Sequence, residues 1–387
     1  MSSSRCNSGT SGNRFDNMIR NCLEYAQNAR AHGLPVVGIM CEYTPREVIM
    51  AAGAVPVCLC GGSASTIPAA EEDLPPALCP LIKSTYGYHM QGSNPFLEMA
   101  DLIVGETTCD GKKKMFELMG KTRPVYVLEL PQKQDKDASL EFWVEEVKRL
   151  SEELECRFGV SITDDKLHEA VEAMNRERSL RRQLAELMKG PTPPFTGRKL
   201  LGLKSSISCI PEDISEYESI LEALTDPSAV EPRSEVRVLL TGVPVVHGAE
   251  RVLDIIEDHG GLVVSMENCT GVKPILEDVN PDSPEPIRAI AEKYYHLPCS
   301  VMTRNDRRID SLRRLARDYG ADCIIEIIWQ GCLTYDIESV LVKRLAENEL
   351  GVPYLKIETD YSPSDSARIT VRVEALFETV RNSIPTG

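Results

Sequence analysis

The chain has 387 residues, of which 42% are hydrophobic and 26% are charged, as is typical of a globular protein with two or three domains. Asp and Glu outnumber Lys and Arg by 59 to 43, which gives a net charge of -16. A chain this acidic is a poor candidate for binding nucleic acid or an anionic membrane, because both are polyanions. Its 13 cysteines are too sparse for a disulfide-stapled mini-domain, and their odd number excludes complete pairing within one chain.

The N-terminal segment favours a cytoplasmic protein. Residues 1–14 are rich in Ser, Gly and Asn, and we expect them to be disordered. They contain no apolar stretch of the kind found in secretory signals, and no apolar run in the chain approaches the roughly 18 residues of a membrane span. Thiols stay reduced in the cytoplasm, so the cysteines are expected to be either buried small hydrophobes or metal ligands.

Short apolar runs alternate with helix-like segments in the first half of the chain. Helices are predicted over residues 15–31, 45–52 and 113–119, the second with Pro45 early in it, as helix starts prefer. The apolar runs predict strands over residues 36–40, 55–60, 102–106 and 125–130. Strands that alternate with helices indicate a parallel sheet covered on both faces.

Residues 139–189 differ from the segments before them. Their apolar residues recur at helical spacing, which predicts long amphipathic helices, and the sequence Gly-Pro-Thr-Pro-Pro at 190–194 then breaks the pattern. We therefore predict a domain boundary here. It separates an N-terminal α/β domain with a helical extension, residues 15–190, from a C-terminal α/β domain, residues 191–387.

The second half repeats the design of the first. Its predicted strands cover residues 236–240, 262–266, 323–328 and 354–357. Its predicted helices cover residues 249–259, 285–295, 309–319 and 337–348. The predicted fold is of the α/β class, with two Rossmann-like (flavodoxin-like) parallel-sheet domains connected by long helices. In open α/β sheets, ligands bind beyond the carboxyl ends of the strands, so the interdomain cleft is the expected site.

Six cysteines fall at positions that suit such a site. Four follow the carboxyl ends of predicted strands, and two lie in loops beside a proline. The strand-end cysteines are Cys41, Cys109, Cys269 and Cys332, and the loop cysteines are Cys79 and Cys299. Each domain thus supplies three. This near-repeat suggests one set of three per domain, although a set that mixes cysteines of both domains is also possible.

Six converging thiolates need cations, because bunched anions repel one another in a low dielectric. Zinc sites favour close Cys pairs, and the only close pair here, Cys58 and Cys60, has no second pair beside it. Iron–sulfur clusters accept ligands from distant loops, and Gly111, Gly271 and Gly331 lie beside the candidate ligands, where small residues help the backbone wrap a cluster. The alternative is that the six are buried structural thiols.

Three segments of the chain match a known family. Residues 41–47 read Cys-Glu-Tyr-Thr-Pro-Arg-Glu and continue to Ala-Ala-Gly-Ala-Val-Pro-Val at 51–57. Residues 108–113 read Thr-Cys-Asp-Gly-Lys-Lys, and residues 368–376 read Arg-Ile-Thr-Val-Arg-Val-Glu-Ala-Leu. Together these segments resemble motifs of the 2-hydroxyacyl-CoA dehydratase and benzoyl-CoA reductase family. The resemblance extends from about Asn17 to the end of the chain.

The resemblance implies an iron–sulfur cofactor. Subunits of this family usually supply three cysteines to one 4Fe-4S cluster, whereas this chain offers six. That count is similar to the double-cubane cluster proteins, in which two 4Fe-4S cubanes are joined by a bridging sulfide into an 8Fe-9S cluster. By this resemblance the six cysteines become the expected ligands. A single 4Fe-4S cluster is the alternative.

The resemblance also implies reduction at very low potential, with electrons delivered by a separate ATP-hydrolysing 4Fe-4S reductase. The sequence agrees that ATP is handled elsewhere, because it contains no G-x-x-x-x-G-K-[ST] phosphate loop. The expected protein is an oxygen-sensitive homodimer that reduces a small molecule. The rivals are a 2-hydroxyacyl-CoA dehydratase subunit, which is a lyase, and an electron-carrier or metal-storage protein.

Reduction needs protons, and four residues are candidates to supply them. His247 follows the first strand of the second domain, and His296 lies three residues before Cys299. Glu42 is next to Cys41, and Glu267 lies two residues before Cys269. The alternative for both histidines is an ordinary surface or core position. Lys112, Lys113 and Lys114 are expected at a solvated helix start, with docking of an acidic partner as the alternative.

Overall fold

The computed structural model describes residues 13–134, 136–224 and 234–383. Residues 1–12, on which most of the predicted disordered segment falls, lie outside this description. Asn13 caps the first helical turn, Arg14–Asn17, so the described chain begins with ordered structure.

Two four-stranded sheets form the centre of the molecule, and all strand pairs within them are parallel. The N-terminal sheet has the order β2-β1-β3-β4, and the C-terminal sheet has the equivalent order β6-β5-β7-β8. The N-terminal strands are β1 (Val36–Ile39), β2 (Val55–Cys58), β3 (Leu102–Glu106) and β4 (Val125–Leu128). The C-terminal strands are β5 (Val236–Gly242), β6 (Gly261–Glu267), β7 (Cys323–Trp329) and β8 (Tyr354–Thr359). The predicted fold class of two Rossmann-like domains is confirmed.

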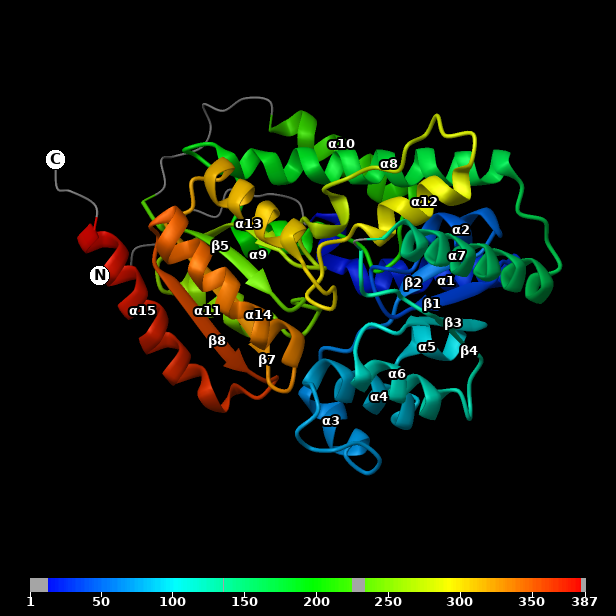
Figure 1. Ribbon diagram of the computed structural model, residues 1–387, viewed down its shortest axis with the longest axis horizontal. Helices are drawn as coiled ribbons and strands as arrows, with labels where there is room; N and C mark the ends of the chain where they lie inside the picture. Colours follow the sequence, from blue (N-terminus) through cyan, green and yellow to red (C-terminus); the bar gives the residue numbers. More distant parts are fainter. Residues whose placement is uncertain (1–12, 135, 225–233, 384–387) are drawn as a thin grey trace.

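Fifteen α-helices surround the sheets in the described residues (Figure 1). In the first half they are α1 (Met18–Ala31), α2 (Arg46–Ala51), α3 (Ile67–Ala70), α4 (Pro80–Gln91), α5 (Pro95–Met99), α6 (Asp110–Met119), α7 (Asp137–Phe158) and α8 (Asp164–Glu186). They continue with α9 (Gly197–Gly202), α10 (Pro211–Ala223), α11 (Arg251–Asp258), α12 (Pro286–Tyr295), α13 (Asp306–Asp318), α14 (Leu333–Arg344) and α15 (Ser366–Ser383).

Four of the strands are buried along their whole length. Every residue of β1, β3, β6 and β7 is buried, which fits the continuous apolar runs of a parallel sheet covered on both faces. All eight predicted strands are present, with ends that differ by a few residues. The predicted long helical region is α7 and α8. Helices α3, α4, α5, α9, α10 and α15 were not among the predicted elements.

The two sheets are joined by more than the chain connection at residue 190. Helix α8 runs along the top of both in Figure 1, and α12 lies against α7 and α8 on the N-terminal side. One hydrophobic core combines residues of the N-terminal sheet with residues between Val279 and Met302. The predicted domain division at 190 stays a prediction, and the packing shows that a segment far beyond it covers the first sheet.

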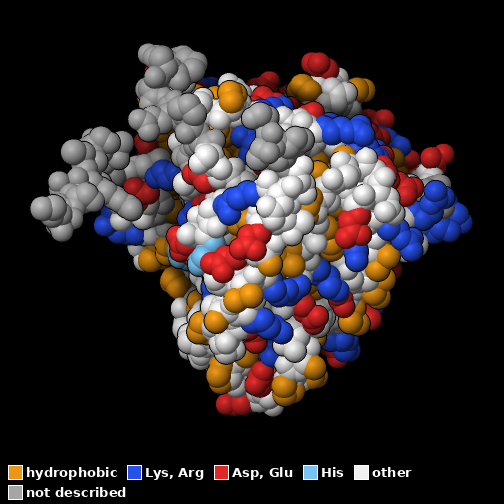
Figure 2. Space-filling view, turned by 90° about the vertical axis from the view of Figure 1, so that its left-hand side faces the viewer, with side chains coloured by type: hydrophobic (Ala, Val, Ile, Leu, Met, Phe, Trp, Pro, Cys, Tyr) orange, Lys and Arg blue, Asp and Glu red, His pale blue; other side chains and the backbone are white. Residues whose placement is uncertain are grey.

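The surface carries charges of both signs. On the face that presents α15, Figure 2 shows Lys and Arg side chains interspersed with Asp and Glu, with no broad patch of one sign. Among the helices of the described residues, none has the length and apolar character needed to cross a membrane.

Candidate functional site

The six candidate cysteines lie where the chain leaves a strand or begins a helix. Cys41 follows β1, Cys269 follows β6, and Cys299 lies in the loop after α12. The other three occupy the N-cap position of a helix: Cys79 of α4, Cys109 of α6 and Cys332 of α14. All six are free thiols and are buried or partly buried.

These thiols influence one another in two groups. The charges acting on Cys41 include those of Cys269 and Cys299, and Cys299 also acts on Cys269. We call these three cysteines triplet 1. Burial disfavours the thiolate form of two of them, because it raises the pKa of Cys41 well above its usual range and that of Cys269 to about 12.

The remaining cysteines form triplet 2, which consists of Cys79, Cys109 and Cys332. The thiol of Cys332 is in direct contact with Cys79 and lowers its pKa, and the same contact raises the pKa of Cys332. Cys109 acts on Cys79, and Cys332 acts on Cys109. Each triplet therefore combines cysteines from both halves of the chain. This is the mixed arrangement that the sequence left open, rather than the one set per domain suggested by the near-repeat.

Helix N-termini surround triplet 2. Backbone N–H groups in the first turns of α4, α6 and α14 donate hydrogen bonds to the three sulfurs. An N-terminus carries the positive end of the helix dipole, so it stabilises a thiolate or another anion. Three such ends make this a place where the fold supports negative charge.

Gly331 allows the two halves to approach at triplet 2. Its φ of 75° lies in the left-handed region. A Cβ atom there would meet the carbonyl oxygen of Ala77 at 2.4 Å and the backbone nitrogen of Cys79 at 3.2 Å. Only a glycine therefore permits this approach of the Cys332 turn to the Cys79 loop, as expected for a small residue beside a ligand.

Tyrosine contacts bring Cys299 to Cys41. The hydroxyl of Tyr43 donates to the carbonyl oxygen of Leu297 at 3.0 Å, and that of Tyr294 donates to the Glu47 carboxylate at 2.7 Å. Both tyrosines are buried, as is the ion pair of Glu47 with Arg178 of α8. Burial makes these hydrogen bonds costly to break, so they fix the loop after α12 beside the loop after β1.

Glu267 belongs to a buried ion-pair network. Arg308, which is fully buried, pairs with Glu267 at 3.1 Å, with Glu326 at 2.9 Å and with Glu338 at 2.6 Å. Lys273 pairs with Glu267 at 3.1 Å. Glu267 is thus held by two cations and is directed toward the domain interior. The network connects β6, which precedes Cys269, with β7 and with α14, which begins after Cys332.

Two charged residues that were not among the predicted site residues lie between these elements. Lys112 donates to the carbonyl oxygen of Met40. Although burial opposes its charge, the neighbouring thiols of Cys41 and Cys60 raise its pKa, and Cys109 adds to this effect. Lys112 therefore faces both triplets, so the predicted solvated position is wrong for this residue. Lys113 and Lys114 are exposed and pair with acids on their own helix, as predicted. The spacing of Lys112 from Phe116 and Met119 could have revealed its inward position, because the three residues lie on the same side of α6.

The second charged residue is Glu106, at the end of β3. Burial raises the pKa of its carboxyl to about 7, and its Oε2 atom has no hydrogen-bond partner within the described ranges of the chain. Thr44 donates to its other oxygen. It is an electrostatic neighbour of Cys41. A carboxyl that titrates near neutral pH can give or take a proton.

A cavity of about 160 Å³ opens beside triplet 1. Residues from both halves line it, including Cys41, Cys269, Glu42 and the pair Cys58 and Cys60. The carboxylate of Glu42 is bound by the Arg46 guanidinium at 2.8 and 3.0 Å. Arg46 also reaches the sulfur of Cys58 at 3.5 Å. The cavity lies beyond the carboxyl ends of β1, β2 and β6, as expected for an open α/β sheet.

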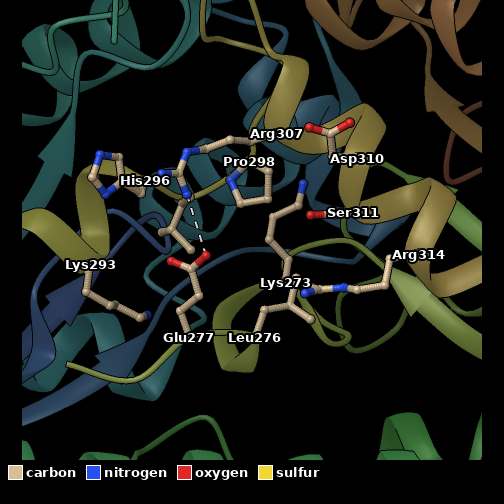
Figure 3. Close-up of a pocket in the computed structure, with 11 residues that line it drawn as sticks. Lys273, Leu276, Glu277, Lys293, His296, Pro298, Arg307, Asp310, Ser311 and Arg314 are labelled. Carbon is tan, nitrogen blue, oxygen red and sulfur yellow. Dashed lines mark ion pairs between the residues drawn. The ribbon is translucent and has the colours of Figure 1, made fainter. Parts of the chain in front are cut away.

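The two candidate histidines lie apart. His247 lines the cavity, with a side chain that is 66% exposed and lies 3.7 Å from the Glu250 carboxylate. His296 lines a different pocket, behind the Cys299 loop (Figure 3). Burial lowers the pKa of His296, and Arg307 lowers it further. Of the four proton-donor candidates, the structure brings only Glu42 and His247 to the cavity.

The donor set suits an iron–sulfur cluster. Within the described part of the chain, no three His, Cys, Asp or Glu side chains are arranged to hold a single metal ion. A cluster is larger than one ion, so its ligands surround a volume and need not meet at one point. The two triplets, the helix N-termini around triplet 2 and the close approach at Gly331 fit such a group.

Comparison with known proteins gives a consistent result. The 2-hydroxyglutaryl-CoA dehydratase, D-component family matches residues 41–380. The chain is 39% identical to the putative dehydratase subunit YjiM of Escherichia coli (strain K12) over 357 residues, 90% of this chain and 92% of that protein. It is 24% identical to the (R)-phenyllactyl-CoA dehydratase beta subunit of Clostridium sporogenes over 95% of this chain and 98% of that one.

A shorter similarity extends to a reductase. One of the benzoyl-CoA reductase subunits of Thauera aromatica is 28% identical over 149 residues, which is 38% of each chain. The expected family is thereby confirmed, and its named members include both dehydratases and reductases. The chain belongs to the 2-hydroxyglutaryl-CoA dehydratase D-component family.

Proposed function

We propose that this protein is an iron–sulfur oxidoreductase that reduces a small molecule at a double-cubane 8Fe-9S cluster. Triplet 1 and triplet 2 would each hold one 4Fe-4S cubane through three cysteines. The observation that carries the proposal is the gathering of six free thiols in two triplets, each drawn from both halves of the chain and both neighbours of Lys112. When bound, the cluster would supply electrons at low potential.

The chain's own residues prepare this site in three ways. The helix N-termini around triplet 2 and the ammonium group of Lys112 between the triplets offset the negative charge of coordinated thiolates. Glu106 retains its proton up to about neutral pH and so provides a proton near Cys41. The cavity beside triplet 1 gives a small substrate access to that triplet.

A dehydratase is the second candidate, favoured by the names of the relatives. In that case one triplet would hold a single 4Fe-4S cluster, and the chain would be a lyase subunit. The presence of two equally complete triplets favours the reductase. An electron carrier or metal-storage protein has less support, because the cavity reaches Cys41 and Cys269, a feature that a carrier does not need.

The proposal includes partners. We propose that a separate ATP-hydrolysing 4Fe-4S reductase donates the electrons, that the protein is a homodimer and that it works in the cytoplasm. Relatives that are named as subunits support a role within an assembly. The substrate is a small molecule, and neither nucleic acid nor a membrane is a proposed partner.

Iron and acid-labile sulfide, measured per chain on anaerobically purified protein, test the proposal. About eight irons per chain supports the double cubane, and about four supports the dehydratase type of cluster. Protein that contains zinc and no iron would contradict both. Acetylene reduction, with a low-potential donor and ATP-dependent reductase present, then distinguishes a reductase from a carrier, because a carrier would turn over no substrate.

A further inference from the structure

The cavity beside triplet 1 is rich in basic side chains although the protein is acidic. Its three arginines each face a carboxylate: Arg46 pairs with Glu42, Arg178 with Glu47 and Arg181 with Glu177. The charges of each pair offset one another. Its three lysines, Lys112, Lys204 and Lys293, have no carboxylate within ion-pair distance among the described residues. The lining therefore has more basic groups than carboxylates.

The three lysines differ in their partners. Lys112 faces thiols of both triplets and Glu106, which support its charge. The other two donate hydrogen bonds to backbone carbonyl oxygens, Lys204 to Thr270 at 3.4 Å and Lys293 to Pro274 at 3.1 Å, and the ammonium group of Lys293 also lies 4.3 Å from the centroid of the Tyr294 ring. Both acceptors belong to the segment 270–274 that follows Cys269. The two ammonium groups thus lie along one wall of the cavity, next to triplet 1.

These two lysines have unused capacity for hydrogen bonds. An ammonium group has three donors, and burying one without an anion is unfavourable. Lys293 is only 7% exposed. Burial, with Arg178 as the next cause, holds its pKa well below the usual range, and burial with Arg181 lowers that of Lys204 to about 8. An anion in the cavity would remove this cost for both residues.

We propose that the cavity binds a small organic anion whose carboxylate group accepts hydrogen bonds from Lys204 and Lys293. This deepens the proposed function by naming the substrate class, and only the role of the anion as substrate rests on that function. A cavity of about 160 Å³ suits a free acid of a few carbon atoms. A coenzyme A thioester is several times larger than this volume, so the proposed ligand differs from the substrates for which the relatives are named.

A second pocket supports the same ligand chemistry. The pocket in Figure 3, of about 300 Å³, also includes Lys293, which therefore lies in the wall between the two spaces. Arg307 and Arg314 extend into it from α13, with Glu277 paired to Arg307 at 3.5 Å. Four cationic side chains and two carboxylates line this pocket. An anion that approaches from this side meets a favourable field before it reaches Lys293.

Calorimetric titration of the anaerobically purified full-length protein tests the inference. The probes are lactate and its uncharged isostere lactamide. We expect lactate to bind, and lactamide to bind at least about tenfold more weakly, because a hydrogen bond between charged groups contributes more than one between neutral groups. Lys204→Gln and Lys293→Gln should each weaken lactate binding by about tenfold.

The matched control is Lys121→Gln, which removes the same charge from an exposed turn and should leave the lactate affinity unchanged. Substitution of the buried Lys293 can impair folding, so the half-buried Lys204 provides a second variant. The iron content reports whether each variant folds. Absence of lactate binding, equal binding of lactate and lactamide, or an equal effect of Lys121→Gln would overturn the inference. If the protein contains iron but does not bind lactate, only this inference is refuted. If it contains no iron but binds lactate through the two lysines, only the proposed function is refuted.

Discussion

Triplet 1 and triplet 2 each consist of three cysteines but differ in their surroundings. Each cysteine of triplet 2 begins a helix, so backbone dipoles support negative charge there. No cysteine of triplet 1 does so, and the side chains of Lys112 and Lys273 supply its nearest positive charges. Triplet 1 borders the cavity, whereas none of the triplet 2 cysteines lines it. Under the proposed function, triplet 1 would be the substrate side and triplet 2 the holding or electron-receiving side.

Removal of one cysteine from each triplet gives the largest expected effect. Cys41→Ser should lose about four of about eight irons, because three thiolates are needed for each cubane, and Cys109→Ser should lose the other four. Iron and sulfide analysis with electron paramagnetic resonance would identify the remaining cubane. Cys156→Ser, at an exposed position on α7, is the control. Loss of all iron in both variants would show that the triplets load as one unit, and loss in neither would remove these residues from the site.

Arg308→Met tests the scaffold that the two triplets share. It leaves Glu326 buried without its cation and Glu267 paired with Lys273 alone, and we expect a loss of about 3–5 kcal/mol in the free energy of unfolding. Urea denaturation measures this change. Arg313→Met, on the outer face of the same helix, removes ion pairs with Asp310 and Glu349 and should change stability little. Equal effects of the two substitutions would mean that the buried network contributes no more than the surface pairs.

Gly331→Ala should disturb triplet 2 selectively. The added Cβ would clash with Ala77 and Cys79, so we expect a loss of about 1–3 kcal/mol beyond the cost of a positive φ. Gly351→Ala is a close control, because Gly351 has a φ of 69° and no atom within 4 Å of the added Cβ. Thermal unfolding and iron content would be compared for the two variants. If Gly331→Ala retains all its iron, the close approach is not required for cofactor binding.

Glu106→Gln addresses the acid beside triplet 1 and should give the smallest effect. The pKa of about 7 lies above the ordinary 4.5, so the folded protein binds more protons than the unfolded chain between these values. Its contribution to stability is therefore present at low pH and falls by about 2 kcal/mol between about pH 5.5 and about pH 8. Denaturation curves at both pH values measure this slope. Glu106→Gln should remove it, and an unchanged slope would assign the titration to another group.

The strand ends could be predicted because buried parallel strands are continuous apolar runs. The run at 102–106 coincides with β3, and the cysteines that follow such runs lie where expected. Helix α4 could not be found in the same way, because its buried face contains Lys83, Ser84 and Thr85. Lys83 pairs with Glu71, and the two hydroxyls bind backbone or side-chain partners, so polar residues replace the apolar pattern.

The division of the cysteines into triplets depends on tertiary contacts that no local pattern encodes. Cys299 joins Cys41 because Tyr43 and Tyr294 hold the loop after α12 against the N-terminal half. The surroundings of Glu267 likewise depend on tertiary contacts that the sequence does not reveal. Its position before Cys269 suggested a proton donor, but Arg308 and Lys273 approach it from distant segments. Its predicted role stays untested, and the structure shows it as part of the scaffold.

The mixed composition of the triplets also constrains how the protein matures. Triplet 1 is incomplete until Cys299 has been synthesised, and triplet 2 is incomplete until Cys332 has been synthesised. If the triplets bind the proposed cluster, neither half of the chain expressed alone would contain a complete set of ligands. Cofactor insertion would then be a late event that follows docking of the two halves, and the growing chain would not hold a reactive cluster in a partly folded state.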